Sequence, residues 1–240
     1  MDADVPQRAR LGRLVRLSPI REFALKAALW LPLCFVIWFW LGALWVMVPA
    51  AIARMVLVGA WPELFNGLSQ GGDVLDAAGR VIAHAGYLLT LNTSVMVTVP
   101  ADASGAGGVG LLEPTLNPMV YAYSLPLFCG LAMATPLATR RRIVQILIAF
   151  AVIWVAQAFG IVCESLKFVA FDAGAPGVAA ILRSGPPSGA IALAYQFGYL
   201  ILPAVIPAGL WIGLNRAFIQ QLVWPDGEPD GRNGGQMSAR

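Results

Sequence analysis

Residues 114–163, PTLNPMVYAYSLPLFCGLAMATPLATRRRIVQILIAFAVIWVAQAFGIVC, place three consecutive arginines between two long uncharged segments. Each segment can cross a bilayer, because a helix rises about 1.5 Å per residue and about 20 apolar residues cover the hydrocarbon core. Arginines next to such spans stay on the cytoplasmic side. The triplet Arg140, Arg141 and Arg142 therefore predicts two membrane crossings and acts as a topology determinant that fixes the direction of both.

The composition of the whole chain also indicates a membrane protein. Of its 240 residues, 58% are hydrophobic and only 12% are charged, and the mean hydropathy is +0.72. Soluble domains carry about 25% charged residues, so this chain has too few to solvate a globule. The net charge is only +3, and the basic residues lie beside apolar segments instead of forming a separate stripe. That distribution argues against nucleic acid as a partner and favours membrane lipids.

The predicted fold class is an all-α polytopic membrane protein with four transmembrane helices and a small β-rich extracytoplasmic loop. The spans are expected to be helical because backbone polar groups in lipid must bond within the segment. The expected order along the chain is a cytoplasmic basic amphipathic arm (1–22), a first span (23–58), an extracytoplasmic β-rich loop (59–117), a second span (118–139), the cytoplasmic Arg loop (140–142), a third span (143–166), an extracytoplasmic loop (167–189), a fourth span (190–215) and a disordered cytoplasmic tail (216–240).

The distribution of basic residues predicts that both termini are cytoplasmic. The N-terminal segment up to Lys26 contains six Lys or Arg residues, whereas the long loop 59–117 contains one Arg against five acidic residues. In the arm, Leu11, Leu14 and Leu17 alternate with arginines, which is typical of a basic amphipathic helix on anionic lipid. A disordered basic leader is the alternative, and the sequence leaves both open.

The long loop has the residue pattern of a small β-structure. Residues 77–80 form a predicted turn, and 87–91 and 94–99 are rich in β-branched side chains. These two segments form either a hairpin or one long strand. We expect a cap of two to four strands that leans on the outer ends of the helices, because so small a unit buries little core alone.

The residue types that usually carry chemistry are sparse. Cys34, Cys129 and Cys163 lie in or at the end of apolar segments, where cysteine usually packs as a small hydrophobe. Cys163 has Lys167 one turn away, but the adjoining Glu164 opposes a thiolate nucleophile. The only histidine lies in the long loop with no second ligand beside it, so the sequence predicts no metal and no cofactor.

Polar residues at the outer ends of the spans form the candidate functional face. Glu164 and Lys167 share one helix face and are expected to form an interfacial ion pair. Polar groups at this depth are costly and often functional, so the alternative is a face for a partner or substrate. Its candidate residues are Asn117, Tyr121, Tyr123, Gln157, Glu164, Lys167, Tyr195 and Gln196.

One stretch within the second span resembles a known family. Residues 116–128, LNPMVYAYSLPLF, resemble the Asn-Pro-Leu-x-Tyr-x-Tyr-Gly-Leu-Pro-Leu-Phe run of the exosortase H-associated membrane proteins. Residues 90–97 resemble the outer segment that precedes this run. Met119 and Ser124 stand where the family has Leu and Gly. The resemblance extends from Phe23 to about Gln221.

The resemblance implies a place in the inner membrane of Gram-negative bacteria, with an exosortase as partner. Such enzymes are membrane-embedded, cysteine-dependent and transpeptidase-like, and they process C-terminally anchored surface proteins. The expected function is therefore that of a non-catalytic accessory protein that binds the exosortase or its sorted substrate. Two alternatives stay open: a small integral membrane enzyme with its site at the outer helix ends, and a subunit of a transporter or channel.

Overall fold

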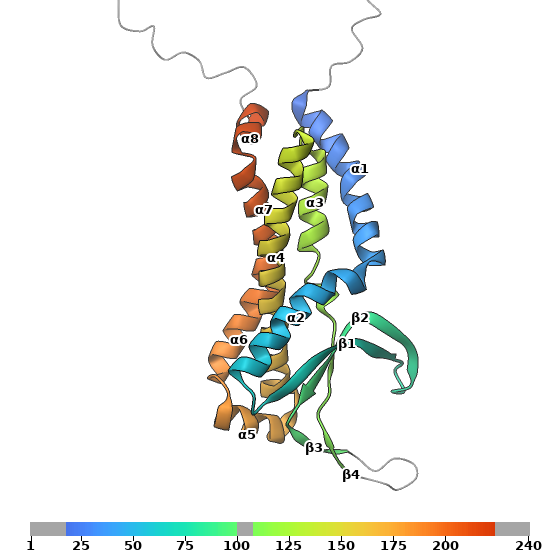
Figure 1. Cartoon of the computed structure of the whole chain (residues 1–240), viewed down its shortest axis with the longest axis vertical. Helices are drawn as coiled ribbons and strands as arrows, with labels where there is room; N and C mark the ends of the chain where they lie inside the picture. The colour runs from blue at the N-terminus through green and yellow to red at the C-terminus, as the bar shows by residue number, and fades with distance from the viewer. Residues whose placement is uncertain (1–17, 100–107, 224–240) are drawn as a thin grey trace, which may run out of the picture.

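The computed structural model describes residues 18–99 and 108–223 as a helical bundle with small β-sheets at one end (Figure 1). Four helical segments in this part of the chain are long and apolar enough to cross a membrane, and an antiparallel sheet lies between the second and the third. The predicted fold class is thereby confirmed. The predicted amphipathic arm up to residue 17 and the tail beyond residue 223 lie outside the described residues.

The first apolar stretch forms two helices, where the sequence predicted one span over 23–58. Helix α1 covers Pro19–Trp40 and helix α2 covers Gly42–Ala60, with a break at Leu41. At about 1.5 Å per residue, α1 alone is ~33 Å long, which is enough to cross a bilayer. The break brings α2 close to the sheet end, because a side chain at Gly42 would lie 3.0 Å from Met119 Cε.

The second predicted span, 118–139, contains a much shorter helix. It begins with the 3₁₀ turn η1 (Pro118–Val120) and continues as α3 (Ser124–Ala134). Helix α3 ends because Thr135 has an extended backbone, the conformation that a following proline favours. The third span is longer than predicted: α4 (Thr139–Lys167) runs on without interruption into the π-helical turn η2 (Phe168–Asp172).

The arginine triplet contains two exposed side chains and one that packs into the bundle. Arg140 and Arg141 are exposed. The Arg142 guanidinium donates to the carbonyl oxygens of Ala132 at 3.3 Å and Thr135 at 3.2 Å. Ala132 lies in the last turn of α3, where carbonyl groups lack a partner within the helix, and Thr135 is the residue that caps this helix. Arg142 therefore caps α3 as well as marking the basic end of the bundle.

The last part of the chain is helical almost throughout. The predicted outer loop 167–189 contains a helix, and so does the start of the tail that was predicted to be disordered from residue 216. This second prediction is wrong for residues 216–223, because the ring of Phe218 packs against Phe23 at a centroid distance of 5.5 Å. The elements are α5 (Gly174–Ser184), α6 (Ser188–Gln196), the π-helical turn η3 (Phe197–Ile201), α7 (Leu202–Leu214) and α8 (Arg216–Val223).

The described strands form two separate antiparallel sheets. One has the order β1-β2-β5 and the other pairs β3 with β4. The prediction that 87–91 and 94–99 make a hairpin or one strand is wrong, because the chain turns after Thr93 and enters the other sheet. The Thr93 hydroxyl supports this turn by donating to Leu112 O at 2.7 Å and accepting from Val95 N at 3.2 Å. The strands are β1 (Phe65–Leu75), β2 (Val81–Thr93), β3 (Met96–Val99), β4 (Gly108–Leu111) and β5 (Thr115–Leu116).

The larger sheet and the helices share one hydrophobic core. Leu89 and Leu91 of β2 are completely buried together with Ala53 and Leu57 of α2 and Ile161 of α4. Burial of a leucine or isoleucine side chain contributes about 1.5–3 kcal/mol when water is the alternative. The sheet therefore leans on the bundle as expected, and its orientation relative to α2 and α4 is fixed by packing.

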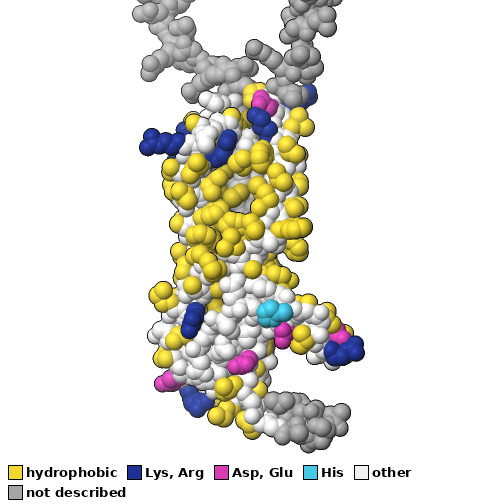
Figure 2. All heavy atoms as spheres, turned by 45° about the vertical axis from the view of Figure 1, so that its right-hand side comes forward, with side chains coloured by type: hydrophobic (Ala, Val, Ile, Leu, Met, Phe, Trp, Pro, Cys, Tyr) yellow, Lys and Arg dark blue, Asp and Glu magenta, His cyan; other side chains and the backbone are white. Residues whose placement is uncertain are grey.

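The surface of the molecule divides into an apolar part and a polar part. On the face shown in Figure 2, hydrophobic side chains cover most of the helical bundle, and Lys and Arg gather at the end away from the sheets. The sheet end carries charges of both signs. In the described residues the apolar exposed side chains include Trp40, which is 84% exposed at the end of α1. Such an apolar belt between two polar ends is typical of an integral membrane protein.

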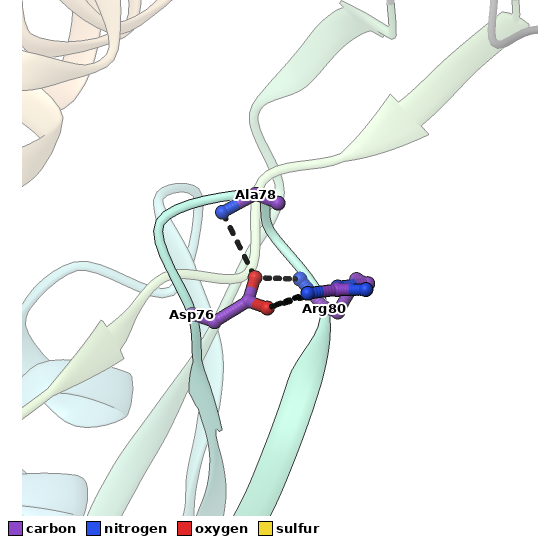
Figure 3. Close-up of polar contacts among 3 residues, drawn as sticks. All are labelled: Asp76, Ala78 and Arg80. Atoms are coloured by element: carbon purple, nitrogen blue, oxygen red, sulfur yellow. Dashed lines mark hydrogen bonds and ion pairs between the residues drawn. The ribbon is translucent and has the colours of Figure 1, made fainter.

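The β1–β2 hairpin closes on a tight turn at the sequence-predicted position (Figure 3). Asp76 Oδ1 accepts the backbone N–H groups of Ala78 at 2.8 Å and Arg80 at 2.9 Å, and Oδ2 accepts the Arg80 guanidinium at 2.9 Å. Gly79 has φ +76°, which glycine adopts without strain. One carboxylate thus holds three donors of the turn together.

Acidification is expected to loosen this turn. The backbone N–H and the guanidinium of Arg80 hold the pKa of Asp76 below its ordinary value. A carboxylate whose pKa is lowered by folding stabilises the folded turn above the unfolded pKa, and the contribution disappears as the pH falls through the folded pKa. Hydrogen-exchange protection of the Gly79 amide should therefore decrease below about pH 4. Asp76→Asn should remove this pH dependence, whereas Asp73→Asn should retain it; an unchanged profile in Asp76→Asn would contradict the assignment.

Candidate functional site

The predicted polar face lies where the sheet end meets the helices, and Tyr121 and Glu164 form its centre. The Tyr121 hydroxyl donates to Glu164 Oε2 at 2.9 Å, although the two residues are 43 positions apart in the chain. Tyr121 is only 2% exposed. It follows η1, whereas Glu164 lies near the end of α4. The hydrogen bond thus joins the entry of the second apolar segment to the C-terminal part of α4.

The ring of Tyr121 occupies a site that a glycine and two further tyrosines shape. A side chain at Gly160 of α4 would lie 3.1 Å from the ring, so glycine at this position leaves the space that the ring uses. Tyr199 of η3 meets the ring edge to face at a centroid distance of 5.8 Å, and Tyr195 of α6 stacks on Tyr199 at 5.2 Å. Aromatic pairs in these geometries are favourable beyond the area that they bury.

Lys167 lies at the outer side of this aromatic group. Its Nζ is 2.5 Å from Asp172 Oδ2 and 5.6 Å from the centre of the Tyr195 ring. The expected ion pair between Glu164 and Lys167 is not formed among the described residues, because Lys167 pairs with Asp172 and Glu164 accepts from Tyr121. The side chains of Lys167 and Asp172 are 32% and 39% exposed, so this pair faces the surroundings while Tyr121 is internal.

The remaining candidate residues have separate surroundings. Gln157 is 5% exposed and donates to Ala122 O at 3.3 Å, which makes it a second brace between α4 and the start of α3. Asn117 is exposed and caps η1 by accepting the N–H of Met119 at 3.2 Å. Tyr123 is half-buried and Gln196 is exposed. The structure therefore connects Tyr121, Glu164, Lys167 and Tyr195 through side-chain contacts and leaves the other four candidates outside that chain of contacts.

Cys163 adjoins this site but has apolar surroundings. It is buried and lines a pocket of about 210 Å³ together with Trp61, Leu166 and Ile191. A thiolate needs a basic or hydrogen-bonding partner, and the residues that line this pocket are apolar. Within residues 18–99 and 108–223 no three His, Cys, Asp or Glu side chains come together as a metal site would require.

A second polar network, which the sequence did not reveal, lies near the basic end. Gln145 of α4 and Asn215 after α7 are 4% and 2% exposed, and each donates its amide to the other at 3.1 and 3.2 Å. Nearby, Trp211 Nε1 donates to Thr135 Oγ1 at 2.9 Å. Gln145 is an uncharged polar residue within an apolar stretch, and this was the indication in the sequence that it takes part in an internal hydrogen bond. Its partner follows 70 positions later, so only the fold identifies it.

Comparison with known proteins adds the family. Residues 17–218 match the family described as exosortase H-associated membrane protein. No curated protein and no solved structure matches the chain. The matched range includes the four candidate spans, both sheets and the connected residues Tyr121, Glu164, Lys167 and Tyr195. Because it covers most of the 240 residues, the chain belongs to the family of exosortase H-associated membrane proteins.

Proposed function

We propose that this protein is a non-catalytic accessory component of an exosortase-type protein-sorting system in the inner membrane, and that it acts by binding the exosortase or its substrate. Membership of the family supports an association with exosortase H. The proposal gives both termini a cytoplasmic location, because the Arg-rich loop lies at the opposite end of the bundle from the sheets (Figure 1).

The observation that carries the proposal is the arrangement of polar and aromatic side chains at the sheet end, which has an internal layer and a solvent-accessible layer. An internal layer, Tyr121 with Glu164, holds η1 against α4. An outer layer consists of Lys167, Asp172 and Tyr195. It presents a cation, a carboxylate and a partly accessible aromatic ring on the surface that the internal layer holds in place. Interfaces between proteins are enriched in aromatic side chains, and charged groups at their rim set orientation and association rate. A surface fixed in this way suits a binding role.

Charge reversal in the outer layer tests this proposal. Lys167→Glu should reduce the amount of exosortase H that co-purifies with the protein from detergent-solubilised membranes by about tenfold, which corresponds to 1.4 kcal/mol. Lys26→Glu is the matched control, because Lys26 is likewise a solvent-accessible lysine in an ion pair, with Glu22 at 2.7 Å, at the other end of the molecule. Equal recovery of exosortase with both variants, at equal amounts of folded protein, would refute a binding role for this surface.

A further inference from the structure

A pocket of about 500 Å³ lies between the smaller sheet and α5, at the end of the molecule farthest from the Arg triplet. Met96 at the start of β3 lines one side, and Ala180 and Arg183 of α5 line the other. Glu63 and Ser184 close it, and the Ser184 hydroxyl donates to the Glu63 carboxylate. This pocket is separate from the surface of Lys167, Asp172 and Tyr195.

One edge of β3 beside this pocket has unused backbone groups. Strand β3 pairs with β4 in the register Met96↔Leu111 to Val99↔Gly108, and Leu112 N donates to Val95 O. Residues of an antiparallel strand alternate in the direction of their backbone hydrogen bonds. Val95 and Val97 therefore bond toward β4, and the backbone N–H and C=O groups of Met96 and Thr98 point away from it. In the described part of the chain these groups have no backbone partner.

The two charged residues that line the pocket, Glu63 and Arg183, do not form an ion pair with each other. The Glu63 carboxylate already accepts from Ser184. The Arg183 Nε donates only to Ala179 O of its own helix at 3.3 Å, and no carboxylate of the described residues lies within ion-pair distance of its guanidinium. A guanidinium with free donors next to an open strand edge is complementary to a carboxylate carried on an extended chain.

We propose that this pocket binds an extended peptide segment that adds to the free edge of β3 and places a carboxylate on Arg183. The backbone groups of Met96 and Thr98 give hydrogen bonds to a peptide of any sequence, and Arg183 selects for an acidic side chain or a free C-terminus. Met96 is 68% exposed and offers an apolar contact to the side chains of the added strand. This proposal rests on the proposed function only in that such a peptide would belong to a partner or a substrate.

The test measures peptide binding by the full-length protein in detergent micelles through fluorescence anisotropy. The probe is a fluorescein-labelled hexapeptide of alternating valine and threonine with a free C-terminal carboxylate. Its amidated form should bind about tenfold more weakly, as expected for loss of one charge-assisted hydrogen bond. Arg183→Ala should make the two forms bind alike. Thr98→Pro removes an outward N–H but no β3–β4 bond, and it should weaken both peptides equally.

The matched control is Arg54→Ala, because Arg54 is another exposed arginine without an ion pair in the described residues and lines a different pocket. It should preserve the preference for the free carboxylate. The proposal is overturned if no peptide binds up to 1 mM, about −4.1 kcal/mol. It is also overturned if the preference survives Arg183→Ala, which would indicate adsorption to the micelle. Neither result affects co-purification with exosortase H, so the two proposals fail independently.

Discussion

Gly130→Ala is expected to lower the free energy of unfolding of the helical bundle by about 1–3 kcal/mol, the usual cost of overpacking. Gly130 lies in α3, and a Cβ there would approach Leu31 of α1 at 2.6 Å from Cδ2 and 3.0 Å from Cα. Helix α1 has no buried residue of its own and packs chiefly on α3. A shift of the α1 backbone away from Gly130 would therefore give up the main contact that holds α1 in the bundle. Small residues at such contacts let membrane helices approach closely.

The measurement is the unfolding midpoint of the purified protein in mixed micelles as the denaturing detergent is increased. Gly209→Ala is the matched control, since Gly209 lies inside the apolar helix α7 and a Cβ there meets nothing within 4 Å. Alanine at 209 should be neutral or slightly stabilising, because it reduces the freedom of the unfolded chain. If both variants unfold at the same detergent concentration, close contact between α1 and α3 does not limit stability.

The class of the fold could be predicted from the sequence because a segment that crosses lipid must be apolar along its whole length. Hydropathy within one short segment is therefore enough to identify a span. Hydropathy and the Arg triplet were sufficient to identify a bundle with one basic end. Hydropathy could not identify the break at Leu41, because α1 and α2 are similarly apolar. The two helices differ in the residues that they contact. Helix α1 has an exposed surface, whereas α2 buries Val46, Ala53 and Leu57 against the sheet and α4.

The strand pairing could not be predicted for a different reason. Residues 87–99 have a continuous β-pattern, and nothing local distinguishes a strand that ends at Thr93 from one that continues. The end is set by nonlocal bonds: Ser94 N donates to Leu64 O, and the Thr93 hydroxyl donates to Leu112 O. The acceptors lie 30 residues before and 19 residues after the donors, so they become visible only when β1 and β5 are in place.

The candidate site was predicted in part. Topology placed Tyr121 and Glu164 at one level, and the structure joins them by a hydrogen bond. The partner of Lys167 was missed because the spacing rules assume an α-helix. After Lys167 the chain enters the π-helical turn η2, in which residues five apart approach each other, so Lys167 meets Asp172 instead of Glu164. A π-helical turn has no clear sequence signal here.

Tyr121→Ala is expected to lower the free energy of unfolding by about 3–5 kcal/mol, the range for removing a large aromatic side chain from a core. The ring is 2% exposed and contacts Gly160 and Tyr199, so its removal leaves a cavity between η1, α4 and η3. Tyr121→Phe keeps the ring and removes only the bond to Glu164, and it should cost about 1–3 kcal/mol. The unfolding midpoint in mixed micelles measures both.

A double-mutant cycle of Tyr121→Phe with Glu164→Gln separates the bond from its surroundings. We expect a coupling free energy of about 1 kcal/mol between the two sites, and a value near zero would mean that the bond contributes no stability. Tyr123→Phe is the matched control, because Tyr123 is half-buried two positions away and has no hydrogen bond from its hydroxyl in the described residues. If Tyr121 acts only as an internal support, exosortase recovery should follow the folded fraction of each variant. Recovery that falls in fully folded Tyr121→Phe would instead place its hydroxyl in the binding event itself.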